Sequence, residues 1–346
     1  MRNGATSKAI AAPCAGAGRM IASAVLAMAM ALALAVQVGA ARAQTAADPA
    51  THRYVEADAP PSAAAAALAD RLGGAAAVFD LVAAGEQRPL ARAEAARLAD
   101  GSLRLLAWQS LTPLPVLRRD IRAAEDLALA EALDRHLPEG ALVLSLPGAS
   151  HRLAALTGAA FPLAAEPEPL AMPGPWTGLE ADVLAVESGQ WGAAVAGADA
   201  ASQGRTRDLI DALLAEDRIG AAQMKVLAGP GDAYLLLHLE DAFQLGFLRP
   251  DRMAMSRAVL ASASFSHDLA QEVRRWSQAN GQAAWAVDRA PDGRLRGNYL
   301  AEPTETATLV AQLLPFNTSR LDSVPGLRLV WQHEGYWLYR IDRIGD

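Results

Sequence analysis

The sequence predicts an α/β protein with a mixed sheet flanked by helices, in one or two lobes, and with a C-terminal antiparallel hairpin. Three observations support this fold class. Hydrophobic residues make up 52% of the chain, enough for a sizeable core. Short apolar runs of strand length alternate with longer amphipathic segments. The stretch "LRLVWQHEGYWLYRI" alternates with period two on both sides of Glu334-Gly335, a tight-turn signal.

The first third of the body predicts helices and strands in alternation. The helical pattern begins at "AAAAALADRL", and the runs "AAVFDLV" and Leu103–Ser110 predict buried strands. Between these runs, "LARAEAARLAD" predicts an amphipathic helix. A second helix is expected over "LRRDIRAAEDLALAEALDRHL". Its residues near the buried face are Ile121, Ala124, Ala128, Leu129 and Ala132, with Arg122, Asp126 and Asp134 off that face.

The remaining elements follow the same alternation. "ALVLSLPG" and Ala233–Glu240 predict buried strands, and "ASHRLAALTG" a helix after the first of them. Residues 164–178 are Pro-rich and interrupt the pattern. We therefore expect an α/β lobe over 63–163, a connection over 164–178 and a second α/β lobe over 179–346.

The N-terminal segment predicts export. Residues 1–43 place basic residues before an apolar run that ends in "ARA", which is typical of a signal peptide. The run over 20–41 is also long enough to span a bilayer, so an uncleaved inner-membrane anchor stays open. Residues 44–62 are expected to be a linker. In either case the body would be periplasmic, free or anchored to the inner membrane.

Charge and cysteine content exclude several classes of function. The net charge is -7, and removing residues 1–43, with four basic residues and no acids, would leave -11, which disfavours nucleic acid as a partner. The one cysteine, Cys14, lies in the segment that cleavage would remove. The body would then lack a thiolate metal site and an attachment site for covalent haem. We expect no metal and no cofactor.

The first candidate site follows the predicted strand "LVLSLPG". Its Pro-Gly turn puts Ser150 and His151 at a helix N-terminus, where backbone N–H groups favour an anion. The alternative is that Ser150 only caps the helix. The glycine spacing and lysine of a nucleotide-binding loop are missing.

The second candidate site is His238 with Asp241, at the C-terminal end of a buried strand, where open α/β sheets carry ligand sites. A histidine beside carboxylates can act as a base or bind a ligand. By strand parity, His238 would share a face with Glu240 and not with Asp241, and it could equally form a hydrogen bond inside the core.

The aromatic hairpin is the third candidate. By period two, Trp331 and His333 share a face with Leu327 and Leu329. Two alternatives stay open: a core role, centred on Trp337 and Tyr339, or a ligand or partner surface. The residues of that surface would be Trp331, His333 and Tyr336.

Four stretches together resemble the HaoB family, hydroxylamine oxidation proteins encoded beside hydroxylamine dehydrogenase. They are "ALVLSLPGASHRLAALTG", "AYLLLHLEDAFQLGFLRPDRM", "LVAQLLPFNTS" and "LRLVWQHEGYWLYRI". The resemblance implies a periplasmic or anchored accessory protein whose partner is the haem-containing hydroxylamine dehydrogenase or another c-type cytochrome. It carries over no catalytic residues.

Three hypotheses follow, the third being a plain exported structural protein. The first is an accessory protein of hydroxylamine oxidation, without catalytic activity of its own. The second is a periplasmic enzyme or small-ligand binding protein with a cleft at the C-terminal ends of the strands. The sequence favours the first.

Overall fold

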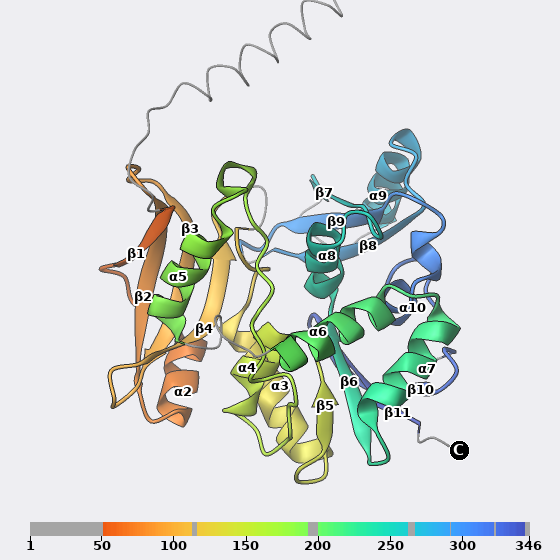
Figure 1. Cartoon of the computed structure of the whole chain (residues 1–346). Helices are drawn as coiled ribbons and strands as arrows, with labels where there is room; N and C mark the ends of the chain where they lie inside the picture. Colours follow the sequence, from red (N-terminus) through yellow and green to blue (C-terminus); the bar gives the residue numbers. More distant parts are fainter. Residues whose placement is uncertain are drawn as a thin grey trace, which may run out of the picture. The chain divides into compact units, whose positions relative to one another are not determined.

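The computed structural model describes residues 51–112, 116–192, 200–261, 267–290, 292–321 and 323–342. The expected signal peptide or anchor, residues 1–43, including the stretch 20–41, lies outside them. These ranges hold nine helices and three sheets, one of them mixed, so the predicted α/β class is confirmed (Figure 1). No helix within these ranges is both long and apolar enough to cross a bilayer.

The first sheet is an antiparallel meander. Its strands are β1 (His52–Glu56), β2 (Ala75–Ala83), β3 (Pro89–Arg97) and β4 (Leu103–Ser110), in that order. Helix α2 (Ala63–Arg71) packs on one face through Leu68, and α5 (Glu180–Trp191) packs on the other through Val183 and Trp191. Strand β1 falls in the segment expected to be a linker and had no counterpart among the predicted elements.

The prediction of a helix over "LARAEAARLAD" is wrong. This segment is β3, which pairs with β2 on one side and β4 on the other. Ala91, Ala93 and Ala95 are buried at every second position, which is the period of a strand. Alanine favours a helix, but two flanking strands supply hydrogen-bond partners along the whole segment, and tertiary pairing overrides local propensity.

The second sheet is mixed and contains the terminal hairpin. The strand order is β10 (Leu327–His333), β11 (Tyr336–Ile341), β6 (Ala233–His238) and β5 (Leu142–Leu144), with only β5 and β6 parallel. One face packs on α3 (Ala123–His136) and α4 (Pro147–Ala154). The other face packs on α6 (Ala200–Leu213), α7 (Asp217–Ala228) and α10 (Leu309–Leu313).

The predicted hairpin is confirmed, and it divides its side chains between two cores. Trp337 and Tyr339 are buried in the core toward α6, α7 and α10, which confirms their core role. Tyr336 faces the core of α3 and α4. The parity predicted for β10 is wrong beyond Leu329, because a bulge there moves Trp331 to the opposite face from Leu329.

The third sheet is antiparallel, in the order β7 (Met255–Val259), β9 (Leu295–Leu300) and β8 (Ala284–Arg289). Helix α9 (His267–Ala279) packs on it through Leu269 and Val273. Helix α8 (Leu239–Leu248) leads from β6 to β7. Two short 3-10 turns complete the described elements, Gly174–Trp176 and Glu305–Ala307.

Two predictions near the candidate sites are wrong: the start and buried face of the helix that contains His136, and the end of the strand predicted over Ala233–Glu240. Helix α3 begins only at Ala123, and within it Asp126 is buried while Ala124 is exposed. Strand β6 ends at His238, where the chain turns directly into α8, so strand parity does not relate His238 to Glu240. The ion pair with Arg152 explains why Asp126 is buried, and the capping of α8 by His238 and Asp241 explains why the strand ends at His238.

Candidate functional site

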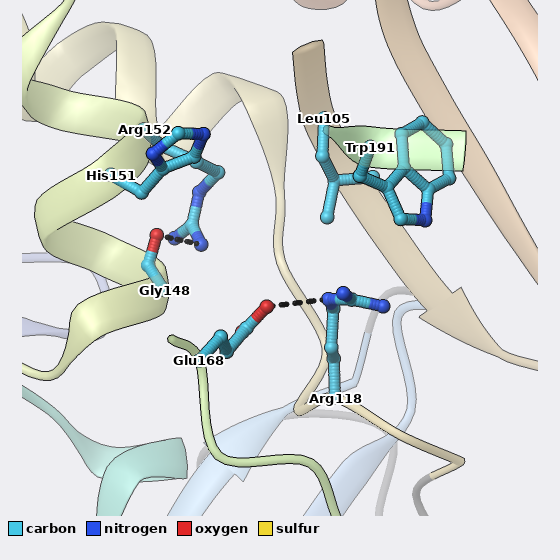
Figure 2. Close-up of a pocket in the computed structure, with 7 residues that line it drawn as sticks. All are labelled: Leu105, Arg118, Gly148, His151, Arg152, Glu168 and Trp191. Carbon is cyan, nitrogen blue, oxygen red and sulfur yellow. Dashed lines mark hydrogen bonds and ion pairs between the residues drawn. The ribbon is translucent and has the colours of Figure 1, made fainter. Parts of the chain in front are cut away.

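A small cavity with apolar and charged lining residues lies beside the first turn of α4 (Figure 2). Its volume is about 20 Å³, enough for a molecule the size of water. Three lining residues come from different elements: Leu105 from β4 of the first sheet, Trp191 from α5, and Arg118 from the extended segment before α3. The other lining residues are Gly148, His151, Arg152 and Glu168.

The two arginines that line this cavity are buried. They differ in whether their guanidinium nitrogens have hydrogen-bond acceptors. The Arg118 guanidinium donates to Glu168 at 2.6 Å and to Glu187 at 2.5 Å. Burial alone would lower the pKa of Arg118, but these two negative charges outweigh it and leave the pKa above its ordinary value. Arg152 donates to Asp126 and to the Gly148 carbonyl, yet its Nη2 has no hydrogen-bond partner among the described residues.

The remaining polar groups of the cavity are His151, on α4, and Glu168. His151 Nδ1 lies 3.2 Å from the Ala164 carbonyl oxygen. Burial, more than the nearby charges, lowers the pKa of His151, so the ring is neutral at pH 7. A Cβ at Gly148 would overlap the carboxylate of Glu168, so glycine is what lets Glu168 approach the helix. The cavity is thus lined by Arg152, whose Nη2 has no partner among the described residues, by a carboxylate and by a neutral imidazole.

His238 lies in a buried junction between β6, α3 and the hairpin. Its backbone N–H donates to Asp241 at 2.8 Å, and its Nδ1 accepts from the Glu240 N–H at 3.0 Å, so both side chains cap α8. The Nε2 atom lies 3.3 Å from a carboxylate oxygen of Glu125, and the ring meets Tyr336 edge-on at 4.6 Å between centroids. A Cβ at Gly335 would overlap the imidazole, so the hairpin turn needs glycine there.

Asp126 is the centre of the same junction. It is 1% exposed and accepts from the Tyr336 hydroxyl at 2.6 Å and from Arg152 Nε at 2.6 Å. Burial would raise the pKa of Asp126, but the Arg152 charge and these hydrogen bonds outweigh it and lower the pKa. Burial first, and then the Asp126 charge, raise the pKa of Tyr336. Arg119 completes the cluster by pairing with Asp241 at 2.9 Å.

Glu240 joins the third sheet to this junction. It is 2% exposed and pairs with Arg257 at 2.9 Å and with Arg296, both from that sheet. Arg296 also pairs with Asp288 at 2.5 Å and with Asp120 at 2.8 Å. Burial would raise the pKa of Glu240, but the two arginines outweigh it and lower the pKa strongly. Such buried pairs fix how elements meet, since each charge requires its partner.

The structure brings three of the seven predicted site residues together: His238, Asp241 and Tyr336, all buried in the junction. His151 is half-buried at the α4 cavity. Ser150 is buried and is not the helix cap that was the alternative, because α4 begins at Pro147. Its hydroxyl donates to the Ser145 carbonyl at 3.0 Å. Trp331 and His333 lie on β10, with centroids 5.8 Å apart and the His333 side chain 50% exposed.

Sequence reasoning missed the charged residues that build these sites. They are Arg118, Arg119, Asp126, Arg152, Glu168 and Glu187. The dense run "RRDIR" before α3 was the one available signal, and the prediction included it in a helix. In the described part of the chain, no group of three or more His, Cys, Asp or Glu side chains is arranged to hold a metal ion.

One comparison with known proteins decides the family. The model of the family described as HaoA-associated protein HaoB matches residues 17–341. The chain belongs to the HaoB family. The predicted family is therefore confirmed over nearly the whole chain, and the name indicates association with HaoA, a hydroxylamine dehydrogenase. No curated protein and no solved structure matches this HaoB-family chain.

Proposed function

We propose that this chain is an exported accessory protein that binds hydroxylamine dehydrogenase and assists it outside the cytoplasm. The observation that carries the proposal is the match to HaoB over residues 17–341, nearly the whole chain. The signal-like composition of residues 1–43 supports export. A c-type cytochrome that accepts electrons from the dehydrogenase is a further partner consistent with this role.

The chemistry of the buried junction supports an accessory role over catalysis. A catalytic base needs access to substrate and a pKa near the working pH. His238 and Asp241 are 3% and 2% exposed, and their polar atoms face other side chains of the junction. Their hydrogen bonds cap α8 and join the elements, which is a structural use of residues that also occur in active sites.

Co-purification tests this proposal. The full-length chain with a C-terminal tag is expressed in its native host, and periplasmic and membrane fractions are purified under mild conditions. We expect hydroxylamine dehydrogenase in the eluate, in fixed proportion to the tagged chain, and an N-terminus at Gln44 if the signal is cleaved. Recovery of the chain without the dehydrogenase from both fractions would contradict the proposal.

A further inference from the structure

A surface groove of about 310 Å³ lies on the second sheet, at the end of the hairpin away from its turn. Its lining includes His136, Tyr234, Arg328, Trp331, Leu338 and Arg340. We call these six residues the hairpin groove. Tyr234 and Leu338 are buried and belong to the core beneath α3 and α4. The groove is therefore a place where that core reaches the surface.

The groove exists because the sheet is wider than its helical cover. Helices α3 and α4 pack on the core that β5 and β6 share with β11, while β10 is at the edge of the sheet. On β10, Arg328 and Val330 are exposed, the latter by 44%, and Trp331 is half-buried against the core. An indole anchored on one side and open on the other is typical of binding hot spots.

The charges of the groove are incompletely matched. Arg328 and Arg340 are direct cross-strand neighbours, an arrangement in which like charges repel. Arg340 pairs with Asp232 at 3.0 Å, whereas no ion pair of Arg328 occurs among the described residues. With His136 the lining has three basic residues and no acidic one, in a chain whose net charge is -7. A carboxylate from outside would relieve the repulsion.

We propose that the hairpin groove binds an acidic, extended segment of the hydroxylamine dehydrogenase. Carboxylates of the segment pair with Arg328 and Arg340, and an apolar side chain packs on Trp331. The edge position of β10 suits an extended chain, since one side of its backbone faces no other strand of the described sheet. This inference rests on the proposed function and names the surface through which it acts.

Affinity measurements on the full chain test this inference. The purified dehydrogenase is titrated onto the immobilised wild type and onto the variants Arg328→Glu and Trp331→Ala. The matched control is Arg53→Glu, which makes the same charge change at an exposed position of β1. Circular dichroism and thermal unfolding establish that each variant is folded. Each titration is repeated at low and high NaCl.

We expect both groove variants to bind at least about tenfold more weakly and the control to stay within about twofold. Wild-type affinity should fall as NaCl rises, and Arg328→Glu should show a weaker salt dependence. If the wild type binds and the groove variants bind equally well, the hairpin groove is not the binding surface, while the proposed function stands. If the wild type does not bind, both are overturned.

A second copy of the chain is the competing occupant. Analytical ultracentrifugation of the chain alone distinguishes it. A concentration-dependent dimer that Trp331→Ala abolishes would assign the groove to self-association and overturn the inference. A monomer at all concentrations is the expected result.

Discussion

The two ends of the terminal hairpin differ in burial. On the same face of the second sheet, the turn end is buried and the other end is exposed to solvent. At the turn, Tyr336 is 2% exposed and bonds to Asp126 of α3. At the other end, Arg328 is exposed beside Arg340, and the charges are only partly paired. Charges that are buried and mutually bonded hold elements together, whereas charges left open beside an aromatic ring are suited to a partner.

Helix α3 is the reason why one end of the hairpin is buried and the other is exposed. Its first turn carries Glu125 and Asp126, which reach His238 and Tyr336 and close the turn end of the face. Its last residue, His136, lines the hairpin groove. One helix thus seals one end of the hairpin and forms a wall of the groove at the other. The comparison predicts that substitutions at the turn end affect stability and that those at the open end affect binding.

The largest expected effect is at Asp126. The change Asp126→Ala leaves Arg152 and Tyr336 buried without their shared acceptor. We expect the free energy of unfolding to fall by about 3–5 kcal/mol, as for other broken buried ion pairs. Urea denaturation measures this. Glu131→Ala, an exposed acid on the same helix, is the control and should stay within about 0.5 kcal/mol. Equal effects of the two changes would contradict the structural role of the turn end.

Acid should weaken the same junction. The pKa of Asp126 is lower in the folded chain than in the unfolded chain, because Arg152 and its hydrogen bonds outweigh burial. Its contribution to stability is therefore present above about pH 4 and is lost as the pH falls through the folded pKa. In urea titrations between about pH 6 and 2, the free energy of unfolding should fall more steeply with falling pH for the wild type than for Asp126→Asn. Parallel curves would refute this source of acid sensitivity.

A smaller loss is expected from Tyr336→Phe. The substitution removes the hydroxyl that donates to Asp126 and accepts from Arg119, but it keeps the ring against His238. We expect unfolding to become easier by about 1–3 kcal/mol. Tyr234→Phe on the neighbouring strand is the matched control, since no hydrogen bond of its hydroxyl occurs in the described residues. A loss in the control as large as in Tyr336→Phe would show that the hydroxyl network is not the cause.

The smallest effect is at the open end. Arg328→Ala removes one member of a like-charged cross-strand pair. The folded chain should be unchanged or more stable by up to about 0.5 kcal/mol, most clearly at low salt. Thermal unfolding at two NaCl concentrations measures it. A destabilisation above about 1 kcal/mol would mean that Arg328 has a structural partner and is not free to bind.

The sequence predicted the elements whose period is unambiguous and failed where alanine obscured it. The strands β4, β6 and β11 have short apolar runs of strand length between turn signals, and the hairpin turn follows from Glu334-Gly335. Strand β3 was mistaken for a helix because its alanine-rich pattern fits both periods. Strand β1 was missed because its five residues include three charged or polar ones, among them the buried His52, and because it follows a Pro- and Ala-rich stretch.

The candidate site was only partly predictable, for a physical reason. His238, Asp241 and Tyr336 stood out as polar or aromatic residues next to apolar runs. Their partners come from distant segments: Arg119 and Tyr336 are separated by 217 positions, and Arg118 and Glu187 by 69. Local patterning contains no information about such pairs. A buried acid such as Asp126 therefore looks solvent-facing until its arginine is placed in space.

The division of the hairpin into a structural end and a binding end is tested by two quantities measured on both Tyr336→Phe and Arg328→Glu: the free energy of unfolding and the affinity for hydroxylamine dehydrogenase. We expect opposite outcomes for the two variants. Tyr336→Phe should lose about 1–3 kcal/mol of stability and keep wild-type affinity while folded. Arg328→Glu should keep its stability and bind at least about tenfold more weakly. Wild-type affinity in folded Arg328→Glu, or lost affinity in folded Tyr336→Phe, would contradict this division.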